Sequence, residues 1–168
     1  HELRVARERG FNLVKFCLWV PPQRFLEIVR EEGLFAWLEL PLWDPSPERA
    51  AQERIEAELA RIVRQYRRHD HILLWTVGCE LSHTVTAEYR RDLVELVRRE
   101  TGCPLVKDNS GSAEMYGGDL REYGTFDDFH PYCDTEFYPP VLDEMLTGAR
   151  TRKPIYLGEF NDLDVHRD

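Results

Sequence analysis

The sequence predicts an α/β fold of parallel strands and covering helices, arranged as part of a (β/α)8 barrel. Two observations support this prediction. Strand-like and helical segments alternate along the whole chain, and polar residues gather where the strand-like segments end. Alternating strands and helices form βαβ units with a parallel sheet. In a (β/α)8 barrel, the carboxyl ends of all strands lie on one face.

The first segments set the pattern of this alternation. Residues 11–20 are rich in apolar and β-prone residues, and 34–43 and 71–78 repeat that composition. Between the first two, 21–33 begins with prolines, repeats apolar residues at helical spacing and stops at a glycine. Such a segment is typical of a helix. The strands are mostly apolar on both sides, as strands covered on both faces of a parallel sheet are.

Two longer amphipathic helices are expected over 46–70 and 86–102. Ser46 is the expected N-cap of the first and Pro47 its first residue, because serine caps helices and proline fits the first helical position. The expected inward-facing residues are Ile55, Leu59, Ile62, Val63 and Tyr66 in the first helix and Tyr89, Leu93, Leu96 and Val97 in the second.

The rest of the chain continues the alternation. Strands are predicted over 104–108, 126–132 and 154–160, and helices over 112–124 and 140–149. Neither GxGxxG nor GxxxxGK[ST] follows the first strand. This argues against the nucleotide-binding doubly wound sheets.

Charge and cysteine usage exclude several partners. The net charge of −9 argues against nucleic acid and against an anionic membrane surface, and no apolar run is long enough for a membrane-spanning helix. The cysteines show no metal-ligand spacing, so we expect neither a metal nor a cofactor. Cys17, Cys103 and Cys133 are interpreted as small buried thiols.

Each predicted strand ends in residues that are able to do chemistry or bind a ligand. In chain order these are Trp19, then Glu39 and Trp43, then Cys79 and Glu80, then Asp108 and Asn109, then His130 and Tyr132, and finally Glu159. We therefore expect the active site on the C-terminal face of a barrel.

Several of these segments resemble motifs of clan A glycoside hydrolases, particularly the catalytic domain of family 2. "HDHILLWTVGCEL" (69–81) resembles the fourth-strand motif of that clan, which ends in W-x-x-G-N-E, and "KPIYLGEF" (153–160) resembles its seventh strand. "GFNLVKF", "EEGLFAWLELP" and "FHPY" resemble the second, third and sixth strands. The resemblance implies a carbohydrate substrate, Glu80 as general acid/base and Glu159 as nucleophile.

The chemistry independently requires such a pair. A retaining glycosidase holds two carboxyl groups about 5–5.5 Å apart across the glycosidic bond. One carboxyl is protonated and serves as the acid, while the other is ionised and attacks the anomeric carbon. Neighbouring carboxylates push their two pKa values apart, which favours this division of roles.

The sequence departs from the resembled pattern at two positions. Cys79 stands where the clan has an asparagine whose amide reaches the sugar 2-hydroxyl, and a thiol is a poor hydrogen-bond donor. Lys15 stands where an arginine often steadies the nucleophile. His130 and Tyr132 lie at the sixth-strand position, where the clan often holds a residue against the nucleophile.

The remaining site residues each leave alternatives open. Trp43 and Trp19 are candidate platforms for a sugar ring or core residues. Glu39 is expected either to bind sugar hydroxyls or to pair with Lys15. Asp108 and Asn109 either line the site or cap a turn.

The length suggests an incomplete barrel, since a complete one takes about 250 residues and this chain has 168. Residues 1–168 would form a single domain that corresponds to strands two to seven. We expect the missing strands, or flanking domains, in a longer parent chain.

Three functions remain open. The first is a retaining glycoside hydrolase. The second is a barrel that binds carbohydrate without cleaving it, which the replacements at Cys79 and Lys15 motivate. The third is a metal-dependent barrel hydrolase that uses Glu39, Asp108, His130 and Glu159.

Overall fold

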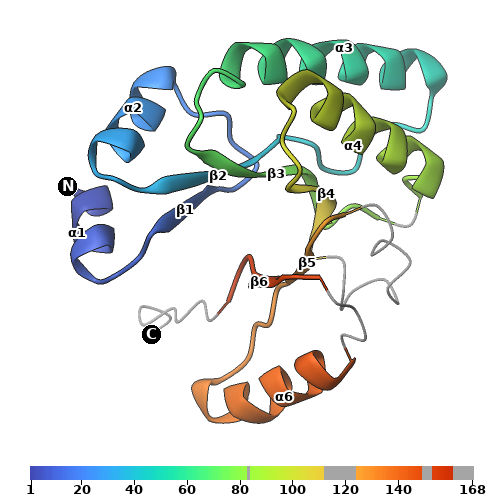
Figure 1. Cartoon of the computed structure of the whole chain (residues 1–168). Helices are drawn as coiled ribbons and strands as arrows, with labels where there is room; N and C mark the ends of the chain where they lie inside the picture. The colour runs from blue at the N-terminus through green and yellow to red at the C-terminus, as the bar shows by residue number, and fades with distance from the viewer. Residues whose placement is uncertain (83, 112–123, 149–152, 161–168) are drawn as a thin grey trace, which may run out of the picture.

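The computed structural model describes residues 1–82, 84–111, 124–148 and 153–160. Strands β1 (Leu13–Phe16), β2 (Phe35–Glu39), β3 (Ile72–Cys79) and β4 (Val106–Ser110) form a parallel sheet in the order of the chain. Strands β5 (Asp127–Phe129) and β6 (Ile155–Leu157) form a second parallel pair. In Figure 1 this pair lies beside the β4 end of the sheet.

Helices connect the strands. They are α1 (Glu2–Glu8), α2 (Gln23–Glu31), α3 (Arg49–Tyr66), α4 (Ala87–Thr101) and α6 (Tyr138–Gly148), with a short 3-10 turn at Thr135–Phe137. Figure 1 shows α2, α3 and α4 on one side of the sheet and α6 below the β5–β6 pair. All strand pairings are parallel among the described residues, so the architecture is a mixed α/β fold consistent with part of an α/β barrel.

The apolar residues form two clusters because successive side chains of a strand point to opposite faces. One cluster fills the space between the sheet and its helices and includes Leu38, Trp75 and Leu93. The other consists of Trp37, Leu74 and Phe126, with Leu13, Leu105 and Tyr156 packed against it. Strands β1, β2 and β3 are therefore apolar on both faces, as their composition predicts, whereas β4 and β5 carry buried polar and charged residues.

The structure corrects the start of α3. The helix begins at Arg49 with Glu48 as its N-cap, so the prediction of Ser46 as cap and Pro47 as first residue is wrong. The Ser46 hydroxyl instead accepts a hydrogen bond from the Glu48 amide (3.3 Å), which places Ser46 in the loop before the helix.

The expected inner faces of the two long helices are largely found. Leu59, Val63 and Tyr66 are buried on α3, while Ile55 and Ile62 are partly buried against the same core. All four expected residues of α4 are buried.

Two further differences concern the sequence predictions. Helix α1 was not expected, and none of its residues is buried. The helix expected over 112–124 lies, apart from its last residue, outside the described residues. No helix in the described ranges combines the length and apolar composition that a membrane span requires.

Candidate active site

Two carboxylates meet at the carboxyl edge of the strands. Glu80 directly follows β3, and Glu159 lies two residues after β6. The His130 Nδ1 atom is 3.1 Å from Glu80 Oε1 and 3.7 Å from Glu159 Oε2. An oxygen of each carboxylate and a ring nitrogen of His130 all lie within 4.8 Å of one another. Strands far apart in the sequence thus bring their terminal residues to one site.

The turn after β3 fixes the position of Glu80. Its backbone has a φ of 47°, in the left-handed region that non-glycine residues rarely adopt. Two hydrogen bonds hold this turn: the Glu80 amide donates to Ser110 O (2.9 Å), and the Leu81 amide donates to the Asn109 side-chain oxygen (2.8 Å). An unfavourable backbone conformation persists only where several surrounding contacts hold it in place. Asn109 therefore supports Glu80 from the neighbouring strand.

His130 links Glu80 to a buried carboxylate. Its Nε2 is 2.8 Å from the Ser110 hydroxyl and 3.5 Å from Asp128 Oδ2. Burial alone would lower the pKa of His130, but Asp128, Glu80 and Glu159 together raise it above its ordinary value. The three carboxylates therefore favour the imidazolium form of His130, which has a donor on each ring nitrogen, more than water does.

Glu159 is surrounded by donors and cations. The Tyr132 hydroxyl donates to Oε2, and the Lys15 ammonium is 3.3 Å from Oε1. Burial alone would raise the pKa of Glu159, but the Tyr132 hydrogen bond and the charges of His130 and Lys15 lower it to about 2. Glu159 is therefore ionised at neutral pH, the state that a nucleophile requires.

Lys15 is held by a fully buried carboxylate. Its Nζ is 3.0 Å from Glu39 Oε2 and 2.9 Å from the Ser110 hydroxyl, and it lies over the Trp37 ring. The other Glu39 oxygen accepts a hydrogen bond from the Leu18 amide (3.1 Å). Burial would lower the pKa of Lys15, but the surrounding carboxylates, Glu39 first, raise it. Of the two roles considered for Glu39, the structure has the pairing with Lys15.

Two thiols approach the same oxygen of Glu159. Cys79 Sγ is 3.6 Å and Cys17 Sγ is 3.3 Å from Glu159 Oε1. Cys79 is buried, and Cys17 is exposed, so the prediction of a buried Cys17 is wrong. Burial first, and the Glu39 charge second, raise the pKa of both thiols, that of Cys17 to about 12. The other two cysteines, Cys103 and Cys133, are only partly buried.

The structure gives the surroundings of three further expected site residues. Trp19 packs against Phe25 on α2 at a ring distance of 5.3 Å, and Trp43 is 63% exposed. Asp108 is fully buried with its Oδ2 3.6 Å from Arg90 Nε on α4. Asp108 belongs to neither of the two potential metal-ligand groups among the described residues, so the four-residue metal set considered above is not assembled there.

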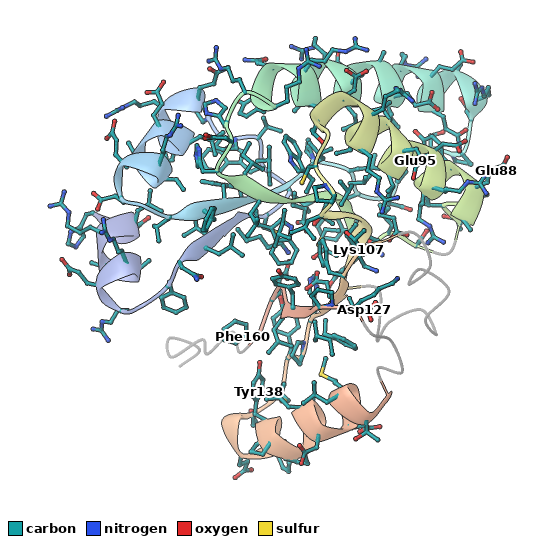
Figure 2. All side chains as sticks on the ribbon, in the orientation of Figure 1. Glu88, Glu95, Lys107, Asp127, Tyr138 and Phe160 are labelled. Atoms are coloured by element: carbon teal, nitrogen blue, oxygen red, sulfur yellow. The ribbon has the colours of Figure 1, made fainter. Side chains whose placement is uncertain are left out.

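A second buried group of charges lies beside Asp108. Lys107 and Asp127 are both fully buried, and Figure 2 shows them close together where β4 meets β5. Burial lowers the pKa of Lys107, and this effect exceeds the opposite one of the Asp108 and Asp127 charges, which raise it.

Sequence reasoning missed Cys17, Ser110 and Asp128 as members of this cluster. The strand period of two contained part of the signal. Cys17 is two residues from Lys15 and Asp128 two residues from His130, so each could share a face with a residue that was identified. Nothing in the sequence marked Ser110, which contacts both Lys15 and His130.

The fold resembles that of known glycosidases. No family model and no curated protein matches the sequence. Among solved structures, a GH2 β-galacturonidase from Eisenbergiella tayi matches 95% of this chain with a TM-score of 0.81 and 15% identity. The β-D-glucuronidase from Dictyoglomus thermophilum matches 95% with a TM-score of 0.77 and 18% identity. A β-glucuronidase from Bacteroides uniformis matches 92% with a TM-score of 0.76 and 18% identity.

These likenesses show a shared fold. The chain spans 21% of the length of the Bacteroides uniformis enzyme, 31% of the Eisenbergiella tayi enzyme and 32% of the Dictyoglomus thermophilum enzyme. The part of those hydrolases that it matches therefore has the same arrangement of strands and helices.

A glycine behind His130 can be tested directly. Gly111 has a φ of 67°, and a Cβ there would lie 2.4 Å from His130 Nδ1. We expect Gly111→Ala to displace the imidazole from Glu80 and to lower the free energy of unfolding by more than Gly102→Ala does. Gly102 has a similar φ of 70° with nothing within 4 Å of its Cβ position, so it controls for backbone strain. Denaturant unfolding measures both variants, and equal losses would contradict the role assigned to Gly111.

The hydroxyl of Tyr132 should govern the ionisation of Glu159. Tyr132→Phe removes the hydrogen bond that lowers the pKa of Glu159, so that pKa should rise from about 2 toward the ordinary 4.5. In the native protein, the depressed pKa stabilises the fold above pH 4.5, and this contribution is lost as the pH falls toward 2. The variant should lose less stability over that range. Acid-range unfolding and carboxyl NMR titration measure the change, with Tyr138→Phe on α6 as the control.

Proposed function

We propose that this chain is part of a retaining glycoside hydrolase that cleaves a β-glycosidic bond, with Glu80 as general acid/base and Glu159 as nucleophile. The observation that carries the proposal is the meeting of the two carboxylates beside His130, where one oxygen of Glu80 and one of Glu159 lie within 4.8 Å of each other. Retaining enzymes hold the two carboxyl groups about 5–5.5 Å apart, whereas inverting enzymes need about 6.5–9.5 Å to admit a water. Two nearest carboxylate oxygens within 4.8 Å are compatible with the shorter, retaining separation, which is the mechanism that we propose.

The environment of Glu159 suits a nucleophile. Lys15 and Tyr132 stabilise its negative charge in the resting state, and its low pKa keeps it ionised over the whole neutral range. It would attack the anomeric carbon while the bond to the leaving oxygen breaks. The carboxylate would be displaced again when water attacks the glycosyl–enzyme intermediate.

The environment of Glu80 suits an acid/base. Its side chain is 27% exposed, so a leaving group and then a water can approach it. Its Oε1 lies 3.1 Å from His130 Nδ1, and this contact orients the carboxyl group. Glu80 would give a proton to the leaving oxygen and later take one from the attacking water. His130, held by Asp128 and Ser110, acts as a positioning residue.

The compared structures suggest where a substrate search should start. They are described as β-glucuronidases and a β-galacturonidase, so β-glucuronides and β-galacturonides are the first substrates to assay. The described residues support the proposed reaction type. Assays with these two classes of glycoside would identify the sugar.

One observation favours the carbohydrate-binding alternative. Cys79 lies 3.6 Å from Glu159 Oε1, where it offers a sugar hydroxyl only a weak donor. A binding protein would keep affinity for the sugar and form no covalent intermediate. The metal-dependent alternative predicts that a chelator abolishes activity. One of its four expected ligands, Asp108, instead forms an ion pair with Arg90.

Covalent trapping tests the nucleophile. A 2-deoxy-2-fluoro glycosyl fluoride should form a stable adduct on Glu159 in the full-length protein, because fluorine slows breakdown of the intermediate. Intact mass and peptide mapping locate the adduct, and Glu159→Gln should remain unmodified. Sugar binding without any adduct would reject the retaining mechanism and favour a binding protein.

Leaving-group dependence tests the acid. Glu80→Gln should reduce hydrolysis of alkyl glycosides by roughly 10²–10⁴-fold, the usual contribution of a general acid. With dinitrophenyl glycosides, the rate of the glycosylation step should fall much less in Glu80→Gln, because their leaving group needs no proton. Glu88→Gln, on the exposed first turn of α4 (Figure 2), serves as the matched control. Equal losses for both leaving groups would remove Glu80 from the acid role.

A further inference from the structure

The two thiols at Glu159 form an arrangement that the glycosidase mechanism does not use. Cys17 follows β1 and Cys79 ends β3, yet both place Sγ against the same carboxylate oxygen, at 3.3 Å and 3.6 Å. A Glu39 oxygen completes the group, and the four atoms all lie within 4.8 Å of one another. This clustering calls for a chemical explanation.

The distances match those between ligands of one zinc ion. Zinc lies about 2.3 Å from a thiolate sulfur and about 2.0–2.2 Å from a carboxylate oxygen. In a tetrahedral site, a sulfur and an oxygen ligand are then about 3.6 Å apart. The Cys79 distance of 3.6 Å equals this value, and the Cys17 distance of 3.3 Å is slightly shorter.

We propose that Cys17, Cys79 and Glu159 bind a thiophilic divalent cation, Zn²⁺ in the first place. Thiolate ligands select zinc over magnesium and calcium, which prefer oxygen. Glu39 or a water takes the fourth position, since three protein ligands with an open position are a common zinc arrangement. Binding of the ion itself is independent of the proposed function, and only its effect on catalysis rests on that function.

Charge balance lets the ion bind beside Lys15. Two S–H bonds break and two protons leave to solvent, while two Zn–S bonds and one Zn–O bond form, with no change of oxidation state. Two new thiolates offset the divalent cation, so the net charge of the cluster does not change. Lys15 keeps its contacts with Glu39 at 3.0 Å and Ser110 at 2.9 Å.

The site is accessible, and the ion would share Glu159 Oε1 with Lys15, whose Nζ is 3.3 Å from that oxygen. Cys17 is exposed, so an ion can reach its thiol from solvent. Tyr132 donates to Oε2, whereas both thiols approach Oε1. An ion on Oε1 would occupy a lone pair that the nucleophile needs. Zn²⁺ would therefore inhibit the glycosidase reversibly.

Cobalt substitution tests ion binding without any assay of hydrolysis. Reduced, metal-free full-length protein is titrated with Co²⁺, and ligation by thiolate produces a charge-transfer absorption in the near ultraviolet. We expect one Co²⁺ per chain, displaced by Zn²⁺. Cys17→Ser should weaken binding by more than the roughly 10–100-fold that is lost when a residue that only hydrogen-bonds to a metal ligand is removed. Cys103→Ser is the matched control, because its Sγ instead contacts the Leu73 carbonyl at 3.5 Å.

The outcomes separate the two proposals. Absence of the absorption, or its survival in both Cys17→Ser and Cys79→Ser, would overturn the metal site. Because Cys17 is exposed, its variant tests the ligand role even where Cys79→Ser fails to fold. Absorption together with no hydrolysis of any glycoside would uphold the metal site and reject the enzyme. Hydrolysis that Zn²⁺ inhibits in the native protein and much less in Cys17→Ser would support both.

Discussion

The rest of the site depends on the contacts that the ionised Glu159 carboxylate makes. This carboxylate joins the two ends of the described chain, because its Oε1 is 3.3 Å from Lys15, 144 residues earlier in the sequence. Its Oε2 accepts a hydrogen bond from Tyr132 and lies near His130, which also contacts Glu80. A half-buried negative charge requires such partners, since an uncompensated one would be costly to desolvate.

A layered interior supports this cluster. The apolar residues Trp37, Leu74 and Phe126 pack together on the face of the strands that points away from helices α2, α3 and α4. The buried charges of Glu39 and Asp128 lie nearer the carboxyl edge, where they hold Lys15 and His130. Burial makes each charge dependent on its partner. The same arrangement gives the two carboxylates different surroundings: Glu159 faces cations and hydroxyl donors, while Glu80 faces solvent and one imidazole.

Much of the fold could be predicted because it follows from local patterns. Alternating apolar segments gave the order of the strands and of the helices that link them, and apolar spacing gave the inner face of α4. Predictions were wrong where a short polar side chain could form more than one kind of hydrogen bond or ion pair. Ser46 resembles a helix cap, but its hydroxyl accepts the Glu48 amide within the loop. Asp108 stands near a strand end like Glu80, yet it points to Arg90 on α4.

The sequence by itself determined which residue types reach the strand ends, because strand length and side-chain alternation are local properties of the chain. It thereby placed Glu80 and Glu159 at strand ends, while their expected roles rested on the resemblance to clan A glycoside hydrolases. Only the tertiary structure decided which strand ends meet and which side chains face each other there. It brought Cys17 and Asp128 into the site and gave Glu159 its low pKa. These properties depend on distances between residues remote in sequence, and no local pattern encodes such distances.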